Sequence, residues 1–481
     1  MKILILNPPY HLAIIREGRC QSPQNMRKNC IPQMTLAYIG GMLKKKGHEP
    51  KVIDCIASDM SAAGVFAVAE QFQPEVVLVN TTTPSINSDS EFIKSFKEKF
   101  SACFTVAFGT HVTACHEDIM SKFPFIDCVI RHEPEWTAMA LVESLAAGRL
   151  DGGVAGCTMR IKGNVVVCPE REFNEDLDSL GYPAWEYFDE SKYTHPVYNK
   201  PYLMVNTSRG CGHSCIFCVA SLFYGKKVRY RSVESILDEI EHHVIGKFGV
   251  RLIWMYADDF KRSPEFVKKL CRRIIERKLK IVWWTNTRVD RIDMEMFGLM
   301  KKAGCCMLSI GGESGNAGIL KNIKKGTKPE FIENTVKALR KTVINSLVYF
   351  LIGLPGETRE TIRETLDFCK KINPDYVEFY PATPYPGTEF YEIAVKQQLI
   401  VNDNWDNFMC GGNEFVIEIP GIRKDELDKI LRNNYSEYYF RFRYFLIFMK
   451  RVGHPSEFLR LLLFGLGYFK RFFVESLSKK G

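Results

Sequence analysis

The chain has 481 residues, enough for two or three domains that each bury a hydrophobic core. Its 16 cysteines are too thinly spread for a disulfide scaffold, and the opening MKILILNPPY is typical of a buried strand rather than a secretory leader. We therefore expect a cytoplasmic protein whose cysteines are mostly reduced. The net charge is +9, and residues 441–481 hold nine Lys or Arg against two Glu. The body of the chain is nearly neutral, so nucleic acid is not an expected partner.

Short apolar runs alternate with helical patterns over residues 1–150. The runs ILIL, KVID, EVVLVN, FTVAF and DCVIR predict strands, and the segments between them predict helices. This alternation predicts an α/β domain with a doubly wound, Rossmann-like parallel sheet. Such sheets bind ligands beyond the carboxyl ends of their strands, which here carry NPPYH, TTTPSIN, FGTH and RHEPE.

Three further segments complete the predicted organisation. Residues 151–200 are rich in proline and aromatic residues and are predicted to be a linker. Residues 201–400 repeat the alternation with six strands, which predicts a (β/α)6 partial TIM barrel whose chemistry lies at the carboxyl ends of its strands. Residues 401–481 are predicted to form a C-terminal helical region that is basic and aromatic.

A cysteine-rich loop, NTSRGCGHSCIFCVAS, follows the first predicted strand of the barrel. It spaces Cys211, Cys215 and Cys218 as Cys-x3-Cys-x2-Cys. A structural zinc site needs four ligands; the adjacent cysteines at 305–306 would point to opposite faces of a strand, and His213 is poorly placed to close a tetrahedron. On a four-iron cluster, three thiolates leave one iron open to bind a small molecule and pass it an electron.

The cysteine spacing, with Phe217 before the last cysteine, resembles the signature loop of the radical S-adenosylmethionine (SAM) enzymes. In that superfamily the open iron of the [4Fe–4S] cluster chelates SAM and cleaves it to a 5′-deoxyadenosyl radical. The later strand ends also resemble the family's cofactor-lining motifs, in order: ADD, GGESG, GLPGE and PYPGT. The resemblance implies that the three cysteines hold the cluster. It also implies SAM contacts from Phe217, Asp258, Asp259, Gly312, Glu313, Ser314, Gly353, Glu357 and Pro384.

The N-terminal domain resembles the cobalamin-binding domain that precedes this barrel in one branch of the superfamily. That branch contains the anaerobic magnesium-protoporphyrin ester cyclase and many cobalamin-dependent radical methylases. The resemblance lies in NPP at the first strand end, in the helix over 35–49, in GTH and in two glutamates after the fifth strand. It implies cobalamin contacts from Asn7, Pro8, Thr82, Gly109, His111 and Glu133.

The histidines of the chain bear on how cobalamin would bind. None of the ten has an Asp two positions before it, as the Asp-x-His-x-x-Gly motif of other cobalamin proteins would require. We therefore expect no protein histidine on cobalt. A flavodoxin-like domain without a corrinoid is the alternative, since a fold alone does not fix a ligand.

The resemblance implies an enzyme that makes a carbon radical on a substrate held between the domains, most often to methylate it. An external donor such as flavodoxin or ferredoxin would reduce the cluster. Two alternatives stay open: a radical rearrangement, ring closure or oxidation without methyl transfer, and a cluster-based redox or corrinoid sensor without catalysis.

The C-terminal tail interleaves aromatic residues with Lys and Arg. Its longest uncharged run, 461–469, is too short to cross a bilayer. A basic, aromatic helix of this type can lie on an anionic membrane surface, which would suit a lipid or other apolar substrate. The alternative is a cap that closes the barrel with its apolar face.

Overall fold

The computed structural model describes residues 1–18, 21, 30–289, 292–412 and 414–444. The first domain holds a seven-stranded sheet of order β2-β1-β3-β4-β5-β6-β7, parallel from β2 to β5. Its strands are β1 (Lys2–Asn7), β2 (Glu49–Asp54), β3 (Val76–Thr81), β4 (Phe104–Gly109), β5 (Cys128–Ile130), β6 (Cys157–Ile161) and β7 (Asn164–Val167). The predicted doubly wound sheet is confirmed.

Two strands of this sheet lie in the segment predicted to be a linker. β6 pairs antiparallel with β5, and β7 pairs antiparallel with β6, so the sheet continues to Val167. The predicted domain boundaries stay predictions, but the hairpin is part of the first sheet. A short antiparallel hairpin breaks the strand–helix alternation that was used to set the boundary at residue 150.

Helices cover both faces of the first sheet. One face packs against α1 (Met34–Lys45) and α6 (Pro134–Ala146), and its core is continuous with that of the second domain. The other face packs against α2 (Ala62–Phe72), α3 (Ile86–Lys99), α4 (Thr110–Ala114) and α5 (His116–Lys122) around a separate core. Neighbouring side chains of β1 such as Ile5 and Leu6 are therefore both fully buried, as parallel sheets require.

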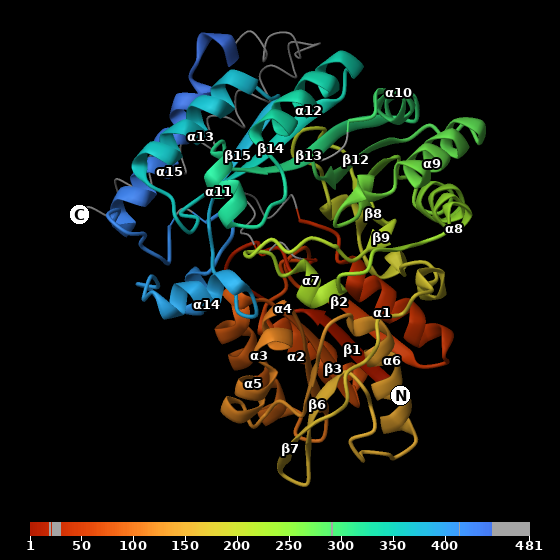
Figure 1. The fold of residues 1–481 in the computed structure, drawn as a ribbon. Coiled ribbons are helices and arrows are strands. Elements are labelled where there is room, and N and C mark those ends of the chain that lie inside the picture. The colour runs from red at the N-terminus through yellow and green to blue at the C-terminus, as the bar shows by residue number, and fades with distance from the viewer. Residues whose placement is uncertain (19–20, 22–29, 290–291, 413, 445–481) are drawn as a thin grey trace.

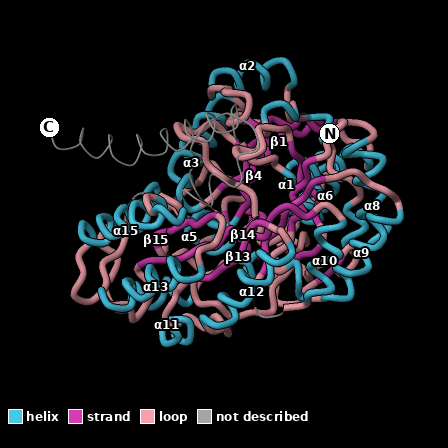
Figure 2. The backbone as a smooth tube through the Cα atoms, turned by 90° about the horizontal axis from the view of Figure 1, so that it is seen from above, coloured by secondary structure: helices cyan, strands magenta, loops and turns pink. Residues whose placement is uncertain are grey.

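The second domain is a six-stranded parallel sheet of order β15-β14-β13-β12-β11-β8. Its strands are β8 (Tyr202–Asn206), β11 (Leu252–Tyr256), β12 (Val282–Thr287), β13 (Cys305–Glu313), β14 (Asn345–Ile352) and β15 (Tyr376–Pro381). Helices lie along its outer side: α8 (Val233–Asp238), α9 (Pro264–Glu276), α10 (Met294–Lys302), α12 (Pro329–Thr342) and α13 (Arg359–Ile372) (Figure 2). This is the predicted (β/α)6 partial barrel, with β8 and β15 at its two edges.

Figure 1 shows the two domains one above the other, with α7 (Ala220–Tyr224) of the barrel domain lying next to α4 of the first. His132, just after β5, joins them: its Nδ1 lies 2.7 Å from the backbone oxygen of Leu222 in α7. The carboxyl ends of both sheets therefore face a shared space.

The helix α15 (Lys424–Tyr439) closes the edge of the barrel at β15. The Tyr435 hydroxyl accepts from the backbone N–H of Phe379 at 3.0 Å and donates to its carbonyl at 2.9 Å. Tyr439 does the same for Val377, at 3.0 and 2.7 Å. The two hydroxyls thus take the place of a seventh strand along this edge.

No helix among the described residues is long and apolar enough to cross a membrane. Most of the predicted basic and aromatic tail, residues 445–481, lies outside the described part of the chain.

Candidate active site

The cysteine loop lies at the carboxyl end of β8, bracketed by a small hairpin. β9 (Ser208–Arg209) precedes the loop, β10 (Arg229–Tyr230) follows it, and the two pair antiparallel. The backbone N–H of Cys211 donates to the carbonyl of Gly225 at 3.1 Å, and that of Cys218 to the carbonyl of Cys215 at 3.2 Å. Cys211 is buried, whereas Cys215 and Cys218 are half-buried. The loop is thus fixed by its backbone, with two cysteines partly open to the space between the domains.

The three thiols of the loop suit a four-iron cluster, in which each thiolate would bind a different iron. Among the described residues, no three His, Cys, Asp or Glu side chains converge closely enough to hold a single ion.

Two cations from other segments of the barrel domain lie near the cysteine loop. Arg288, just after β12, places Nη1 3.6 Å from the Cys215 sulfur and donates through Nη2 to the carbonyl of Lys325. The Lys325 ammonium lies 2.5 Å from Glu313 and 6.0 Å from the ring centre of Phe217. Positive charge beside thiols stabilises thiolates, and would offset the negative charge of a thiolate-bound cluster.

The GGESG segment that ends β13 is tightly constrained. A Cβ on Gly312 would lie 2.8 Å from a methyl of Val348, so the position requires glycine. Glu313 has φ +61°, a left-handed conformation that costs about 1–3 kcal/mol in a non-glycine residue. The Ser314 hydroxyl lies 3.0 Å from that of Thr365 on α13. The packing holds the Glu313 carboxylate in a strained backbone turn beside Lys325.

The two aspartates after β11 face the cysteine loop. Asp258 accepts a hydrogen bond from the backbone N–H of Gly210 at 3.2 Å. Asp259 lies 3.6 Å from His213. Burial alone would raise the pKa of Asp259, but the hydrogen bond from His213 and the charge of Arg288 outweigh it and lower that pKa. Asp259 therefore stays ionised at neutral pH.

Two buried polar groups at strand ends have atoms without a hydrogen-bond partner in the described part of the chain. They are both amide atoms of Asn206, the last residue of β8, and Oε1 of Glu357. The other oxygen of Glu357 accepts from the backbone N–H groups of Gly353 at 2.7 Å and Leu354 at 3.0 Å. Burial raises the pKa of Glu357 to about 8. Unpaired buried polar atoms are costly, so their presence here fits a site built for a polar ligand such as SAM.

Pro384, the last predicted SAM contact, lies buried in the loop after β15. The structure therefore brings all the residues predicted to contact the cluster and SAM to the carboxyl ends of the barrel strands. Their individual roles stay predictions.

The predicted cobalamin contacts lie along the carboxyl edge of the first sheet. Arg16 enters this edge between β1 and β3, where the strand order changes direction. Its guanidinium donates to the Asn7 side chain at 2.7 Å, to the Pro8 carbonyl at 2.9 Å and to Asp89 at 2.7 Å. Thr82 lies 2.8 Å from the Ser85 hydroxyl. Asn7, Pro8 and Thr82 thus belong to a buried network that orders the loops of this edge.

Gly109 and His111 shape the same edge beside β4. A Cβ on Gly109 would lie 2.0 Å from the carbonyl oxygen of Thr81, so only glycine fits. His111 is buried against the ring of Trp405 at 5.1 Å. Burial, aided by the charge of Lys122, lowers the pKa of His111 to about 3, so the imidazole is neutral.

A cavity of about 550 Å³ opens next to this edge, with Tyr10, His11, Met60 and Phe92 among its lining residues. None of the six residues predicted to contact cobalamin lines this cavity, whose walls come from the loops after β1 and β2 and from α2 and α3.

Glu133 and Glu135, at the start of α6, form buried ion pairs with the hairpin that brackets the cysteine loop. Glu133 pairs with Arg229 at 2.5 Å, and Glu135 pairs with Arg209 at 2.6 Å. Arg209 also lies 3.7 Å from Glu133, and all four side chains are at most 4% exposed. The predicted contact between Glu133 and cobalamin stays a prediction; in the structure its carboxylate joins the first domain to the barrel.

The sequence analysis missed four cations of this region: Arg16, Arg209, Arg288 and Lys325. Arg288 directly follows β12 and Arg209 lies just before the cysteine loop, whereas Arg16 and Lys325 lie nine or more positions beyond the ends of β1 and β13. Sequence does not show which charges become buried, and these four are at most 7% exposed.

Comparisons with known proteins agree with this geometry. The model of the radical SAM superfamily matches residues 205–369, and that of the B12 binding domain matches residues 25–142. The chain is 32% identical to the uncharacterized methyltransferase PH0819 of Pyrococcus horikoshii, over 92% of this chain and 93% of that protein. It is 28% identical to the anaerobic magnesium-protoporphyrin IX monomethyl ester cyclase of Rubrivivax gelatinosus, over 91% of this chain and 77% of the cyclase.

Among solved structures, the cobalamin-dependent SAM radical enzyme OxsB, with aqua-cobalamin and SAM bound, shares the fold with a TM-score of 0.74 at 15% identity. The match covers 97% of this chain and 71% of OxsB. A doubly wound domain combined with a partial barrel is thus a fold that OxsB shares.

The chain belongs to the radical SAM enzymes that carry an N-terminal B12-binding domain. Its cofactors are a [4Fe–4S] cluster, SAM and cobalamin. Enzymes of this class act on small molecules and draw electrons from an external reductant.

Proposed function

We propose that this enzyme methylates an unactivated carbon of its substrate. The observation that carries the proposal is the position of the cysteine loop, held between the barrel and the B12-binding domain by the buried pairs of Arg209 and Arg229. When bound, the cluster and SAM supply a carbon radical and cobalamin supplies the methyl group. The similarity to a methyltransferase over nearly the whole chain supports methyl transfer.

The residues of the chain would divide the work as follows. Cys211, Cys215 and Cys218 each hold one iron. Arg288 and Lys325 balance the charge of the cluster, because they are the cations that lie against the loop and its motifs. The residues that would contact SAM are Asn206, Phe217, Asp258, Asp259, Gly312, Glu313, Ser314, Gly353, Glu357 and Pro384.

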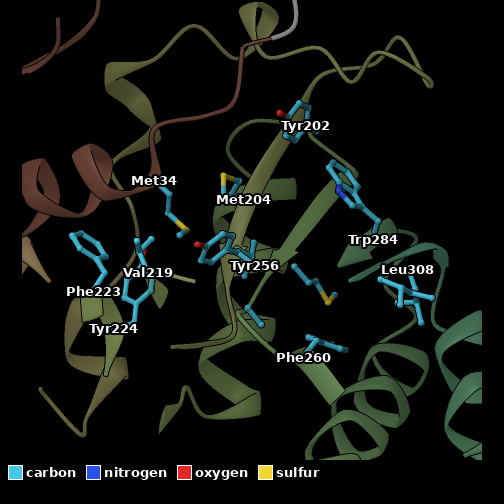
Figure 3. Close-up of a cluster of buried hydrophobic side chains, with 14 of the residues drawn as sticks. Met34, Tyr202, Met204, Val219, Phe223, Tyr224, Tyr256, Phe260, Trp284 and Leu308 are labelled. Carbon is cyan, nitrogen blue, oxygen red and sulfur yellow. The ribbon is translucent and has the colours of Figure 1, made fainter. Parts of the chain in front are cut away.

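The interface between the domains would keep water from the radical. Figure 3 shows Met34 of α1 pointing toward Tyr256 of β11, with Tyr224 of α7 nearby. All three are at most 5% exposed. A carbon radical needs such a dry setting because side reactions with solvent components would quench it.

Product analysis tests the proposal. The anaerobically reconstituted enzyme, given SAM, reductant, methylcobalamin and substrate, should form S-adenosylhomocysteine together with 5′-deoxyadenosine. The similarity to a ring-forming cyclase favours a second candidate, a radical reaction without methyl transfer, which would yield 5′-deoxyadenosine alone. Neither product would point to a sensor and contradict both.

We also propose a role for residues 445–481, which lie outside the described part of the chain. They dock on an anionic membrane and give the enzyme access to an apolar substrate. A truncation that tests this must retain Tyr435 and Tyr439, because their hydroxyls bind the backbone of the barrel edge. A chain ending at Tyr444 keeps them and should lose binding to anionic vesicles. Each Lys or Arg near such a surface contributes about 1 kcal/mol, screened by salt. Failure of the full chain to bind vesicles at low salt would refute the proposal.

A further inference from the structure

The strands β14 and β15 present two different faces. Phe350 and Phe379 point outward: Phe350 contacts Phe368 of α13, and Phe379 contacts Tyr435 of α15. The alternation of a strand therefore turns Tyr349 and Tyr380 toward the lumen of the barrel. Their rings stack, with centroids 5.7 Å apart and an interplanar angle of 19°. Both are only partly buried, although the barrel surrounds them.

One carboxyl group lies in this aromatic wall. Glu378 is the register partner of Tyr349, so it faces the lumen beside the stacked rings. The Tyr380 hydroxyl donates to its Oε2. Its Oε1 makes no hydrogen bond to any described residue, and the side chain is partly exposed. Burial among these groups raises the pKa of Glu378.

Glu378 is not among the residues proposed above to contact the cofactors. They lie at or beyond the carboxyl ends of the strands, whereas Glu378 lies in the middle of β15. The tryptophans of β11 and β12 do not extend this wall, because Trp284 is buried against His195 and Tyr202. The wall on β14 and β15 thus combines two stacked aromatic rings with a carboxyl oxygen that has no partner among the described residues, which is the composition of a small-molecule site with one orienting polar group.

We infer that Tyr349, Glu378 and Tyr380 form the substrate-anchoring wall of the barrel, and that the substrate is an apolar, ring-bearing molecule with one hydrogen-bond donor. The inference rests on the proposed function in that the barrel encloses the substrate. The ring lies against the stacked tyrosines, and its N–H or O–H donates to Oε1 of Glu378. The bond fixes which carbon faces the cofactors.

A matched pair of probes tests this without knowledge of the natural substrate. 2-Naphthol has a hydroxyl donor, and 2-methoxynaphthalene has the same rings without one. Equilibrium dialysis against the anaerobic holoenzyme, without reductant, should show saturable binding of both and about two- to tenfold tighter binding of 2-naphthol, because a hydrogen bond between neutral groups contributes about 0.5–1.5 kcal/mol. Equal affinities, or no saturable binding, would overturn the inference.

Three variants locate the effect. Glu378→Leu should bring the ratio of affinities to about one, and Glu378→Gln, which keeps an acceptor oxygen, should restore part of it. Glu360→Leu, an exposed glutamate on α13, is the matched control and should keep the native ratio. Cluster and cobalamin absorption report the folding of each variant. An unchanged ratio in a folded Glu378→Leu protein refutes the assignment.

The dialysis is independent of catalysis. Failure of the native enzyme to cleave SAM with reductant would refute the proposed function and leave the binding result standing.

Discussion

The mouth of the barrel and the carboxyl edge of the first sheet are both predicted cofactor sites, yet they are built differently. At the barrel mouth, Asn206 and Glu357 hold buried polar atoms without partners in the described chain, and Glu313 sits in a strained turn. At the edge of the first sheet, Asn7, Pro8 and Thr82 are bonded to Arg16 and Ser85, and the buried atoms without described partners are Oγ1 of Thr110 and Nε2 of Gln21. The barrel mouth therefore combines unmet amide and carboxyl atoms with a strained turn, whereas the edge of the first sheet is organised around the guanidinium of one buried arginine.

The largest expected effect is at the barrel mouth. Cys215→Ala removes one of three thiolates, so the cluster absorption near about 400 nm and all cleavage of SAM should disappear. Absorption spectra and 5′-deoxyadenosine assays measure both. Cys369→Ala, buried on α13 away from the loop, is the matched control and should keep the cluster. A Cys215→Ala protein with both properties would show that this loop holds no cluster.

The second effect concerns the ion pairs that join the two regions. Arg209→Leu leaves Glu135 buried without its partner, which should lower the free energy of unfolding by about 3–5 kcal/mol. Urea unfolding of the apo protein, followed by tryptophan fluorescence, measures this loss. Arg363→Leu breaks exposed pairs with Glu437 and Asp367 and should cost about 0–1 kcal/mol. Equal losses in the two variants would mean that the buried pairs do not hold the domains together.

A third, smaller effect depends on pH. Burial raises the pKa of Glu357 from an ordinary 4.5 to about 8, so the folded state holds a proton that the unfolded state releases. Its contribution to stability is complete below about pH 4.5 and is lost as the pH rises through about 8. Glu357→Gln cannot ionise, so its stability should fall less over this range. If the free energies of unfolding of the two proteins change equally from pH 5 to 8, Glu357 does not hold the raised pKa that its burial without a full set of hydrogen bonds implies.

The smallest expected effect is at the edge of the first sheet. With no histidine on cobalt, bound cobalamin should show a base-off absorption spectrum that His11→Ala leaves unchanged. His11 is the informative position because it lines the cavity beside the edge. A base-on spectrum that His11→Ala abolishes would show that a histidine at this edge binds the cobalt.

Most of the architecture could be predicted from the sequence, because regular strand–helix alternation and glycine-rich strand ends carry local signals. The cysteine spacing and the GGESG and GLPGE segments likewise placed the barrel mouth. The β6–β7 hairpin could not be recognised, since NVVV reads as a surface run within a linker. The role of Glu378 could not be predicted either. A glutamate within YVEFYP is expected on the solvent-facing side of an ordinary strand, and only the tertiary structure shows that this side faces the inside of the barrel.

The role assigned to Glu133 shows the other limit of sequence reasoning. The family resemblance predicts that Glu133 contacts cobalamin, and this contact stays a prediction. The structure shows in addition that its carboxylate accepts a hydrogen bond from Arg229, 96 positions further along the chain. Long-range charge pairing of this kind leaves no local pattern.

The tyrosines of α15 have a consequence for solubility and assembly. An open barrel leaves β15 with unpaired backbone groups that could recruit a strand from another molecule. Because a tyrosine hydroxyl both accepts and donates, Tyr435 and Tyr439 saturate this edge from the side. Neighbouring copies of the enzyme therefore meet no unpaired backbone groups at Val377 and Phe379, and the edge does not recruit a strand from them.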